Sequence, residues 1–181
     1  MKNTKVVTKL TIGFVIILVA TVFSITLGLI GEINNVKEGL ENKARIVDPL
    51  NEMVKFSIAY GNVRSATRDI GRATEEDATE RHITTLTNNM KICIDEFNDY
   101  LSIFGDDEHN TEEYIKVKAT RDALVAYGKV CQDKLVPAGR ANNAEEVFRI
   151  ITEELAPYGT IIRENVDFLV NLKAEQTEEE D

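Results

Sequence analysis

An uninterrupted stretch without a charged residue, Leu10 to Ile30, constrains the fold of this chain more than any other feature. As an α-helix rising 1.5 Å per residue, these residues would extend about 31 Å, the thickness of a bilayer's hydrocarbon core. The preceding residues, 1–9, contain three lysines and no acid, a pattern typical of the cytoplasmic side of membrane helices. The sequence therefore predicts a single-pass protein of the inner (cytoplasmic) membrane, with residues 1–9 in the cytoplasm, a transmembrane helix over 10–30 and the remainder extracytoplasmic.

Two other interpretations of the apolar stretch remain open. A cleaved signal peptide has a shorter apolar part, followed by a cleavage site of small residues. Here the stretch is longer, and residues 27–32 (LGLIGE) contain no such site. A buried core helix is the second alternative, although a soluble bundle rarely makes a helix apolar on every side. The uncleaved anchor is the interpretation that the sequence favours.

The composition of the chain limits its classes of partner. The chain has 21 Lys and Arg against 31 Asp and Glu, and a formal net charge of −10. Because residues 1–30 contain three lysines and no acid, the remainder carries −13. So acidic a surface repels nucleic acid and anionic lipid head groups, and we expect neither as a partner. The absence of Trp and the abundance of Ala, Glu, Lys, Leu and Ile favour helix.

Apolar residues beyond the membrane stretch recur at steps of three and four, as on one face of an α-helix. Short polar connections separate the resulting stripes. The predicted fold is therefore all-α, with the transmembrane helix followed by an up-down-up-down antiparallel four-helix bundle over 31–176. The expected helices are at about 31–73, 75–104, 112–137 and 144–176, followed by an acidic tail over 177–181.

Capping residues and prolines mark the expected helix ends. Asp48-Pro49 predicts a kink or a restart in the first helix, because proline is tolerated at a first helical position behind an Asp cap. Thr74, Thr111 and Asn143 stand before acidic residues and are predicted N-caps. Pro157 predicts a bend in the fourth helix, whose apolar stripe is predicted to be Val147, Ile151, Leu155, Tyr158, Ile162, Leu169 and Leu172.

Cys93 and Cys131 are the only cysteines, and outside the cytoplasm such a pair is compatible with a disulfide. Folding the second helix against the third about residue 108 sets Cys93 level with position 123, eight residues or about 12 Å from Cys131. A disulfide requires Cα atoms within about 7 Å. Both residues also lie on the apolar stripes, so the sequence favours two reduced core thiols, with a bridge as the alternative.

Patterns for catalysis or metal binding are absent from the sequence. The two histidines, His82 and His109, do not form the Glu-x-x-His pairs of carboxylate-bridged metal bundles. There is no haem-binding Cys-x-x-Cys-His, no glycine-rich phosphate loop and no nucleophile with a partnered base. The acidic residues 106–108 are interpreted as a solvated loop. We therefore expect no enzyme activity, no catalytic residue, no metal site and no cofactor.

One polar cluster stands out from this background. Arg64, Arg68 and Arg72 recur every four residues near the end of the first helix, so they form a diagonal ridge that turns away from the bundle's own core. Guanidinium groups bind carboxylates through paired hydrogen bonds, and the ridge is a candidate site for a small organic acid. The more ordinary interpretation, which the spacing alone favours, is that each arginine pairs with a nearby acid such as Asp69.

The layout of these features resembles the extracytoplasmic four-helix-bundle sensor domain of methyl-accepting chemotaxis proteins. The similar features are the lysine-flanked anchor, the first helix interrupted at Asp48-Pro49, the arginine row near its outer end, and the fourth helix bent at Pro157. The likeness covers essentially the whole chain and rests on layout rather than on a signature motif.

The resemblance implies a homodimer whose first helices pack together. It also implies a small ligand, such as an amino or organic acid, bound at the dimer interface directly or through a periplasmic binding protein. The implied ligand-binding residues are Arg64, Arg68 and Arg72, with Tyr158 and Thr160 of the proline turn. Tyr158 departs from aspartate and serine receptors, which have Thr after this proline, and the arginine spacing also differs slightly. The identity of the ligand is therefore not transferred.

Receptors of this family continue through a second membrane helix into a cytoplasmic hairpin that controls a histidine kinase complex. The sequence shows no second apolar stretch before Asp181, so we interpret the chain as a receptor fragment or an orphan sensor module. The predicted function is that of the ligand-sensing domain of a bacterial chemotaxis transducer, which reaches the kinase only through the missing cytoplasmic part. The alternative is a single-span, membrane-anchored bundle that acts as a scaffold or adaptor without a small ligand.

Overall fold

The computed structural model describes residues 36, 37, 39 and 43–179. The chain divides into two compact units, Met1–Lys43 and Ala44–Asp181. In the first unit, residues 36, 37 and 39 are helical, and the transmembrane helix predicted over 10–30 lies outside the described residues. None of the helices in the described part of the chain is long and apolar enough to cross a bilayer. All further description concerns the second unit.

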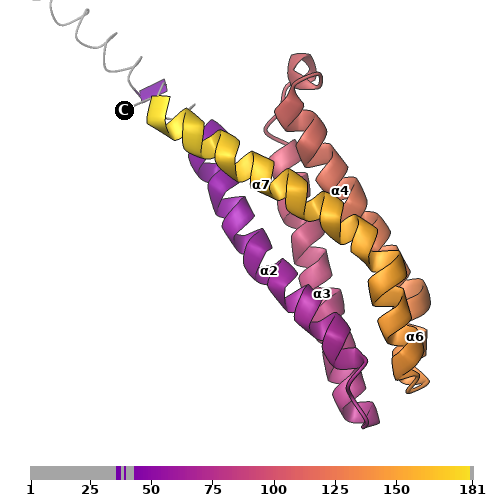
Figure 1. The fold of residues 1–181 in the computed structure, drawn as a ribbon. Coiled ribbons are helices and arrows are strands. Elements are labelled where there is room, and N and C mark those ends of the chain that lie inside the picture. The colour runs from indigo at the N-terminus through magenta and orange to yellow at the C-terminus, as the bar shows by residue number, and fades with distance from the viewer. Residues whose placement is uncertain (1–35, 38, 40–42, 180–181) are drawn as a thin grey trace, which may run out of the picture. The chain divides into compact units, whose positions relative to one another are not determined.

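Helices make up the second unit, and the described residues contain no strand, as the sequence predicts. The long helices are α2 (Asp48–Ile70), α3 (Glu76–Leu101), α4 (Glu112–Val130) and α7 (Ala156–Glu179) (Figure 1). Shorter segments join them, namely η1 (Lys43–Val47), η2 (Asp106–Glu108), η3 (Cys131–Leu135), α5 (Val136–Arg140), α6 (Ala144–Arg149) and η4 (Ile150–Leu155). The residues 177–179 of the predicted acidic tail continue α7 as helix.

The long helices alternate in direction and pack in the order α2, α3, α4, α7 around the bundle (Figure 1). α2 lies along α3, and α4 packs against both α3 and α7, whereas α2 and α7 touch each other only slightly. The turns over 71–75 and 141–143 lie at one end, which we name the closed end. η1, η2 and the last turns of α7 lie at the opposite end, named the η1 end. The fold is thus an antiparallel four-helix bundle whose α2–α7 edge is weakly packed.

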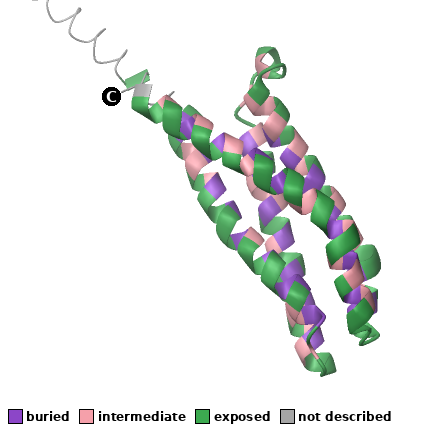
Figure 2. Ribbon diagram, viewed as in Figure 1, coloured by how far each residue is buried: buried purple, intermediate pink, exposed green. Residues whose placement is uncertain are grey.

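The core follows the apolar stripes of the sequence (Figure 2). Residues at steps of three and four are buried between the helices, for example Met53, Phe56 and Val63 of α2 and Leu86, Met90, Cys93 and Phe97 of α3. The rings of Phe56 and Phe97 meet edge to face with their centroids 5.0 Å apart. This aromatic contact is a favourable geometry, and it joins α2 to α3 in the middle of the core.

Each of the three prolines in the chain follows a π-helical segment. Pro49 comes two residues after η1, Pro137 two residues after η3, and Pro157 two residues after η4. A proline has no N–H for the usual hydrogen bond to the fourth preceding carbonyl, and its ring collides with that carbonyl. The wider π turn accommodates both effects by inserting one residue. The interruption expected at Pro157 therefore takes the form of a π segment inside a helix that continues from α6 into α7, and the one expected at Pro49 is the π segment η1 directly before α2.

The π segment before Pro157 changes which residues of the last stripe are buried. Ile150 and Leu155 are each only 1% exposed although they are five residues apart. A step of five returns to the same face in a π-helix, and η4 covers both residues. The predicted burial of Ile151 is therefore wrong, and this residue is only half-buried, because a strict α-helical period does not count the inserted residue.

Lys173 is buried at the η1 end, where the sequence predicts that Leu172 faces the core. The prediction is wrong because a polar network holds the lysine inside. Its Nζ lies 2.7 Å from Glu113 Oε1 and donates to the Arg45 carbonyl oxygen at 2.7 Å and to Gln176 Oε1 at 2.9 Å. An ammonium group carries three donors, so three acceptors satisfy it completely. A buried charge is tolerated only with such complete pairing.

Two of the three predicted N-caps are present. The Thr111 side chain accepts a hydrogen bond from a backbone N–H in the first turn of α4 at 3.2 Å. Asn143 Oδ1 accepts from the Glu146 N–H at 3.1 Å, at the start of α6. The predicted Thr74 cap is wrong, because Glu75 occupies the extended position before α3 and forms no capping side-chain hydrogen bond.

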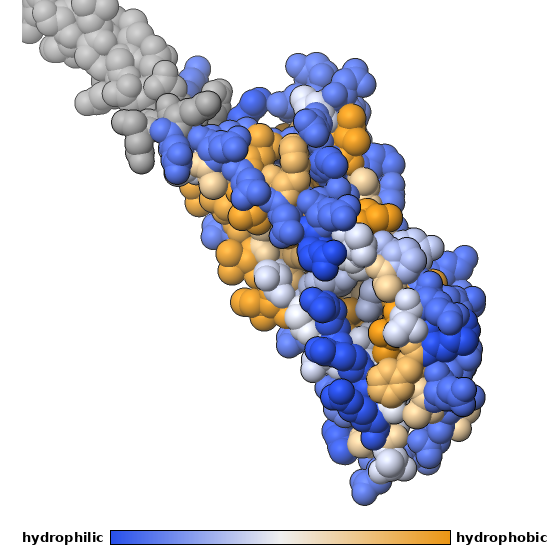
Figure 3. All heavy atoms as spheres, in the orientation of Figure 1, coloured by the Kyte–Doolittle hydropathy of each residue, from blue (hydrophilic) through white to orange (hydrophobic). Residues whose placement is uncertain are grey.

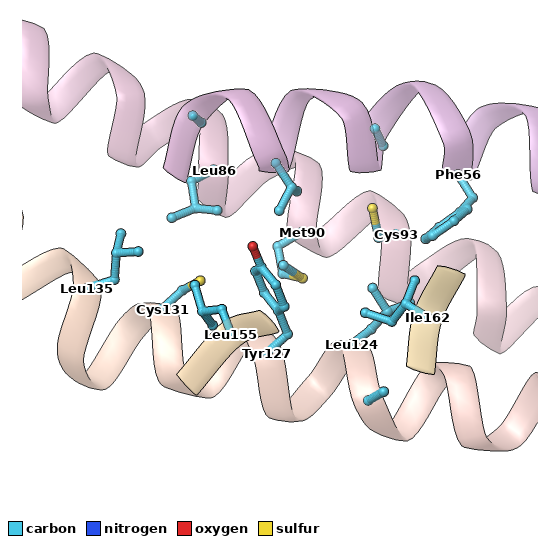
Figure 4. Packing of buried hydrophobic residues seen from close by; sticks show 14 of the residues in the cluster. Phe56, Leu86, Met90, Cys93, Leu124, Tyr127, Cys131, Leu135, Leu155 and Ile162 are labelled. Carbon is cyan, nitrogen blue, oxygen red and sulfur yellow. The ribbon is translucent and has the colours of Figure 1, made fainter. Parts of the chain in front are cut away.

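Cys93 and Cys131 are free, buried thiols, as the sequence favours. Gly128 of α4 packs on Met90 of α3, since Met90 Cγ lies 3.2 Å from where a β-carbon of Gly128 would stand. With positions 90 and 128 level, Cys93 is level with position 125, six residues from Cys131. Figure 4 shows the two sulfur atoms at different levels of the core. Burial raises the pKa of each thiol to about 12, which keeps both protonated at neutral pH.

Candidate functional site

Arg64 and Arg68 lie exposed on α2, and Arg72 is exposed in the turn that follows it. Within the described residues, none of these three arginines forms an ion pair. The arginines that do are Arg45, Arg121, Arg140 and Arg149. Arg68 donates from Nε to the Arg64 carbonyl oxygen at 3.1 Å. Asp69, the nearest acid on the helix, accepts instead from the Ser65 hydroxyl at 3.0 Å. The interpretation in which nearby acids neutralise the arginine row is therefore wrong in this structure.

A groove of about 590 Å³ follows the weakly packed edge between α2 and α7. Its floor reaches the buried core at Phe56, Tyr127 and Ile162. Its polar lining includes Tyr60, Arg64, Thr67 and Arg68 of α2, and Thr160, Arg163 and Asp167 of α7. An apolar floor with a few converging polar groups is the usual composition of a small-molecule site. The cationic rim adds a preference for an acidic ligand.

Tyr60 spans the groove from α2 to α7. Its hydroxyl oxygen lies 3.4 Å from where a β-carbon of Gly159 would stand, so the missing side chain of Gly159 makes room for the phenol. Burial raises the pKa of Tyr60 above its usual value, and the positive charges of Arg64 and Arg163 only partly oppose this rise. The phenol therefore stays protonated at physiological pH. In this form its hydroxyl can donate a hydrogen bond to an acidic group.

Three of the five residues proposed from the sequence as ligand-binding line this groove, namely Arg64, Arg68 and Thr160. Arg72 is exposed in the turn after α2 and is not among the lining residues. Tyr158 is half-buried and packs against the core cluster instead. The structure thus brings together residues from the arginine row and from the proline turn, which are about 100 residues apart in the chain.

Arg163 of α7 also lines the groove, and sequence reasoning missed it. It is exposed and forms no ion pair within the described residues. One signal could have found it. Arg163 lies three residues after Thr160, and residues at that spacing share a helix face. A prediction that placed Thr160 in a site should therefore have included Arg163.

The face that contains α2 and α7 has a distinct surface (Figure 3). A band of the most hydrophilic residues runs along it, and apolar side chains gather at its α2 edge. The exposed arginines Arg64, Arg68 and Arg163 line the groove on this face. In a chain with a net charge of −10, these three residues outnumber the one acid of the lining, Asp167, and make a local region of positive potential.

The acidic loop between α3 and α4 uses its carboxylates internally. Glu108 forms an ion pair with Arg45 at 3.0 Å and accepts a hydrogen bond from the Gly105 N–H at 2.9 Å. Within the part of the chain that the structure describes, no three His, Cys, Asp or Glu side chains gather in a way that could hold a metal ion. The groove between α2 and α7 is the candidate site because two of the predicted arginines line it; a second groove, of about 750 Å³ between α3 and α4, contains none of the ligand-binding residues predicted from the sequence.

An antiparallel four-helix bundle with a ligand-sized groove between its first and last long helices has the architecture of a helical sensory module. The family described as the four helix bundle sensory module for signal transduction matches residues 3–181. The chain belongs to this family, the sensory modules of methyl-accepting chemotaxis signal transduction proteins, and the predicted resemblance is confirmed. No curated protein and no solved structure has significant similarity to the chain.

Proposed function

We propose that this module binds a small organic or amino acid directly in the α2–α7 groove, as the ligand-sensing domain of a bacterial chemotaxis transducer. The observation that carries the proposal is the pair Arg64 and Arg68, which line a groove of about 590 Å³ and form no ion pair within the described residues. Guanidinium groups without partners, next to an apolar floor, favour a carboxylate through charge-assisted hydrogen bonds.

The proposed ligand uses both the rim and the floor of the groove. Its carboxylate binds Arg64 and Arg68, and the Tyr60 hydroxyl supplies a further hydrogen bond. The Thr160 hydroxyl donates to the Ala156 carbonyl oxygen at 3.2 Å and lines the groove without a free donor. Its apolar part lies over the half-buried apolar side chains of the lining, Ile151 and Val166. Covering their exposed parts removes apolar surface from water, which contributes about 25 cal/mol per Å² to binding.

A second copy of the chain is the proposed partner of α2. The exposed residues of this helix continue a stripe with steps of four and three, and the apolar members Val54 and Ile58 are 59% and 66% exposed. Steps of four and three are the spacing of a coiled-coil seam. We name this stripe the α2 seam; its residues are Val47, Asn51, Val54, Ile58, Gly61, Ser65, Arg68 and Arg72. Val47 is the last residue of η1, and Arg72 lies in the turn after α2.

The α2 seam ends in two of the arginines of the candidate site. In a parallel homodimer, each seam residue faces the same residue of its partner. Arg68 and Arg72 of both copies would then lie close together, and like charges repel. A bound anion relieves this repulsion, so the proposed ligand site and the proposed dimer are coupled. This arrangement also gives Arg72 a role although it does not line the groove of one chain.

The proposed orientation follows from the N-terminal sequence. Residues 10–30 anchor the protein in the inner membrane, with residues 1–9 in the cytoplasm and the bundle outside. Because the groove lies between α2 and α7, a ligand changes how these helices sit against each other. In this proposal α7 carries the change towards the membrane, and a histidine kinase complex receives it through a further cytoplasmic part.

The test is thermal unfolding of the full chain in detergent micelles, with a panel of amino and organic acids. A ligand at 100 times its Kd adds about 2.7 kcal/mol to the stability of the native state. For a domain of this size we expect a rise in Tm of about 5–10 °C. Arg64→Ala and Arg68→Ala should abolish the rise. Arg81→Ala should retain it, because Arg81 is an exposed arginine of α3 away from the groove.

Two results would reject the ligand site. One is a panel in which no acid raises the Tm of the wild-type chain. The other is a rise that survives both Arg64→Ala and Arg68→Ala. Either result would favour the alternative, a membrane-anchored bundle that acts as a scaffold or adaptor through its α2 seam.

A further inference from the structure

The second groove, which we name the α3–α4 groove, is separate from the candidate site. It has a volume of about 750 Å³ and shares no lining residue with the α2–α7 groove. Its lining runs along α3 from Ile83 to Asp95, and from Val125 of α4 through η3 to Arg140 of α5. A volume in this range is typical of small-molecule sites. The bundle therefore has room for a molecule at a place that the proposed function does not use.

Gly128 leaves space in the middle of the α3–α4 groove. Met90 Cγ lies 3.2 Å and Met90 Sδ 3.7 Å from where a β-carbon of Gly128 would stand, so a larger side chain there would press on the methionine. Cys131, three residues after Gly128, also lines the groove. Met90 and Cys131 come from facing helices and are both buried (Figure 4). The floor of the groove is therefore apolar and contains two sulfur-bearing side chains.

Most charges at the rim of the α3–α4 groove are compensated within the chain. The Lys91 ammonium donates to Asp95 at 2.7 Å. Arg140 donates to Glu80 from Nε at 2.6 Å and from Nη2 at 3.1 Å. Among the charged lining residues, Lys129 alone has no ion pair within the described part of the chain. A single exposed ammonium beside an apolar floor can lie over the face of an aromatic ring.

We propose that the α3–α4 groove binds a small, uncharged aromatic molecule. The Met90 thioether contacts the edge of an aromatic ring favourably, and the Lys129 ammonium contacts its face. A carboxylate is disfavoured on this floor, because an anion buried there would lack the pairing that compensates for lost hydration. The inference goes beyond the proposed function and does not rest on it, since the two grooves have separate linings.

NMR of the methionine methyl groups tests the proposal at the site itself. The chain has three methionines; Met90 lines the α3–α4 groove, whereas Met53 is buried in the core and lines neither groove. The sample is the full chain in micelles, isotope-labelled at its methionine methyls. Each probe is titrated with its free concentration outside the micelles measured. Benzyl alcohol and cyclohexylmethanol differ only in the aromaticity of the ring, and benzoate adds a charge.

Benzyl alcohol should shift the Met90 signal saturably and leave the Met53 signal unchanged. We expect it to bind about threefold or more tightly than cyclohexylmethanol, because only the aromatic ring makes the sulfur and ammonium contacts. Lys129→Gln should remove most of this preference and leave cyclohexylmethanol binding within about twofold. A Met90 signal that no probe shifts would overturn the proposal. Tighter binding of benzoate than of benzyl alcohol at Met90 would also overturn it.

A matched pair of tryptophan variants tests the location of the site. Thr87 is exposed on α3 and lines the groove, so Thr87→Trp fills the space of the ligand and should weaken benzyl alcohol binding about tenfold or more. Asn88→Trp places the same side chain on an exposed part of α3 outside the lining and should leave binding within about twofold. Circular dichroism checks that both variants are folded. Equal binding by the two variants would overturn the assignment of the site to this groove.

Discussion

The Nζ of Lys173 lies 2.7 Å from Glu113 Oε1, with only 3% of the lysine side chain and 15% of the glutamate side chain exposed. The same carboxylate accepts a hydrogen bond from the Tyr100 hydroxyl at 2.8 Å, and Lys173 also donates to the carbonyl oxygen of Arg45. One buried ion pair therefore joins α3, α4, α7 and η1 at the η1 end. It holds the last turns of α7 in register with the start of α2.

The first prediction concerns this ion pair. Glu113→Ala leaves the Lys173 ammonium buried without its counter-ion, which costs about 3–5 kcal/mol of unfolding free energy. Lys173→Met should cost less, because the remaining Glu113 is more exposed and keeps the Tyr100 hydroxyl. Urea denaturation of the full chain in micelles measures both values.

A surface pair provides the matched control for this prediction. Lys118 and Asp122 form an exposed ion pair at 2.8 Å on α4, and Asp122→Ala should cost only about 0.5 kcal/mol or less. The double variant Glu113→Leu with Lys173→Met should recover much of the loss, because no buried charge remains. A cost for Glu113→Ala no larger than that for Asp122→Ala would contradict the prediction.

The sequence predicts the helices and most of the core because local preference and apolar spacing agree there. The stripe Ile83, Leu86, Met90, Cys93 and Phe97 of α3 is buried as its three- and four-residue steps indicate. The spacing fails near Pro157, where η4 inserts a residue and Ile150 is buried in place of Ile151. A proline signals an interruption, but the phase of the helix beyond it depends on packing that a single segment does not reveal.

The candidate site is predicted in part, for a related reason. The row of Arg64, Arg68 and Arg72 is visible in the sequence because its spacing is local. The absence of ion pairs and the position of Arg163 depend on how α7 lies against α2, which no local pattern contains. The same holds for Lys173, whose partner Glu113 is 60 residues away. Contacts of charged residues between helices are therefore where sequence reasoning is weakest.

The second prediction concerns the two thiols and alkaline pH. Burial raises the pKa of Cys93 and of Cys131 from about 9.0 to about 12. In the unfolded chain the thiols ionise near pH 9, whereas in the folded chain they stay protonated until about pH 12. Their contribution to stability is therefore full below pH 9 and is lost as the pH rises towards 12. Each thiol steepens the fall in unfolding free energy by at most about 1.4 kcal/mol per pH unit.

The double variant Cys93→Ala with Cys131→Ala tests the alkaline prediction. Its stability should be lower at every pH because buried volume is lost, but it should fall less steeply than the wild type between pH 9 and 10.5. Buried tyrosines with raised pKa values, such as Tyr60, add a fall of the same sign in both proteins. Equal slopes in urea denaturation series of the two proteins would contradict burial of the thiols in neutral form.

The third prediction concerns Gly139 of α5, which packs against Ile70 at the closed end. A β-carbon at Gly139 would collide with Ile70 Cγ2, so Gly139→Ala should destabilise the bundle by about 1–3 kcal/mol. Gly61→Ala is the matched control within one chain, since nothing lies within 4 Å of a β-carbon there. Because Gly61 belongs to the proposed α2 seam, both variants are compared at a dilution at which the chain is monomeric. In an exposed helical position alanine is the better helix former, and Gly61→Ala should stabilise by up to about 1 kcal/mol. Thermal unfolding of both variants distinguishes the collision from a general effect of alanine.

The fourth prediction separates a true helix cap from an apparent one. Asn143 accepts the hydrogen bond from Glu146 that α6 needs at its start, and Asn143→Ala should cost about 1 kcal/mol. Thr74 precedes acidic residues in the same manner, but it is not the cap of α3. Thr74→Ala should therefore change stability by less than about 0.5 kcal/mol. Equal losses in urea denaturation would show that Thr74 caps α3 after all.

The last prediction concerns the α2 seam and the proposed homodimer. Ile58 is 66% exposed at the centre of the seam, so an aspartate there should not disturb the bundle of one chain. In a parallel dimer it would place two carboxylates opposite each other in an apolar contact, which costs several kcal/mol. We expect Ile58→Asp to weaken dimerisation at least tenfold, as measured by sedimentation equilibrium of the full chain in density-matched micelles.

Ile115→Asp makes the dimer test specific. Ile115 is 53% exposed on α4 and lies outside the α2 seam. The same change of charge at this position should leave dimerisation unaffected, because α4 is not part of the proposed contact. Equal weakening by both variants would point to a general effect of the added charge, and a dimer unchanged by Ile58→Asp would exclude the α2 seam as the interface. Only selective weakening by Ile58→Asp supports a homodimer in which two α2 helices bring their arginine rows together.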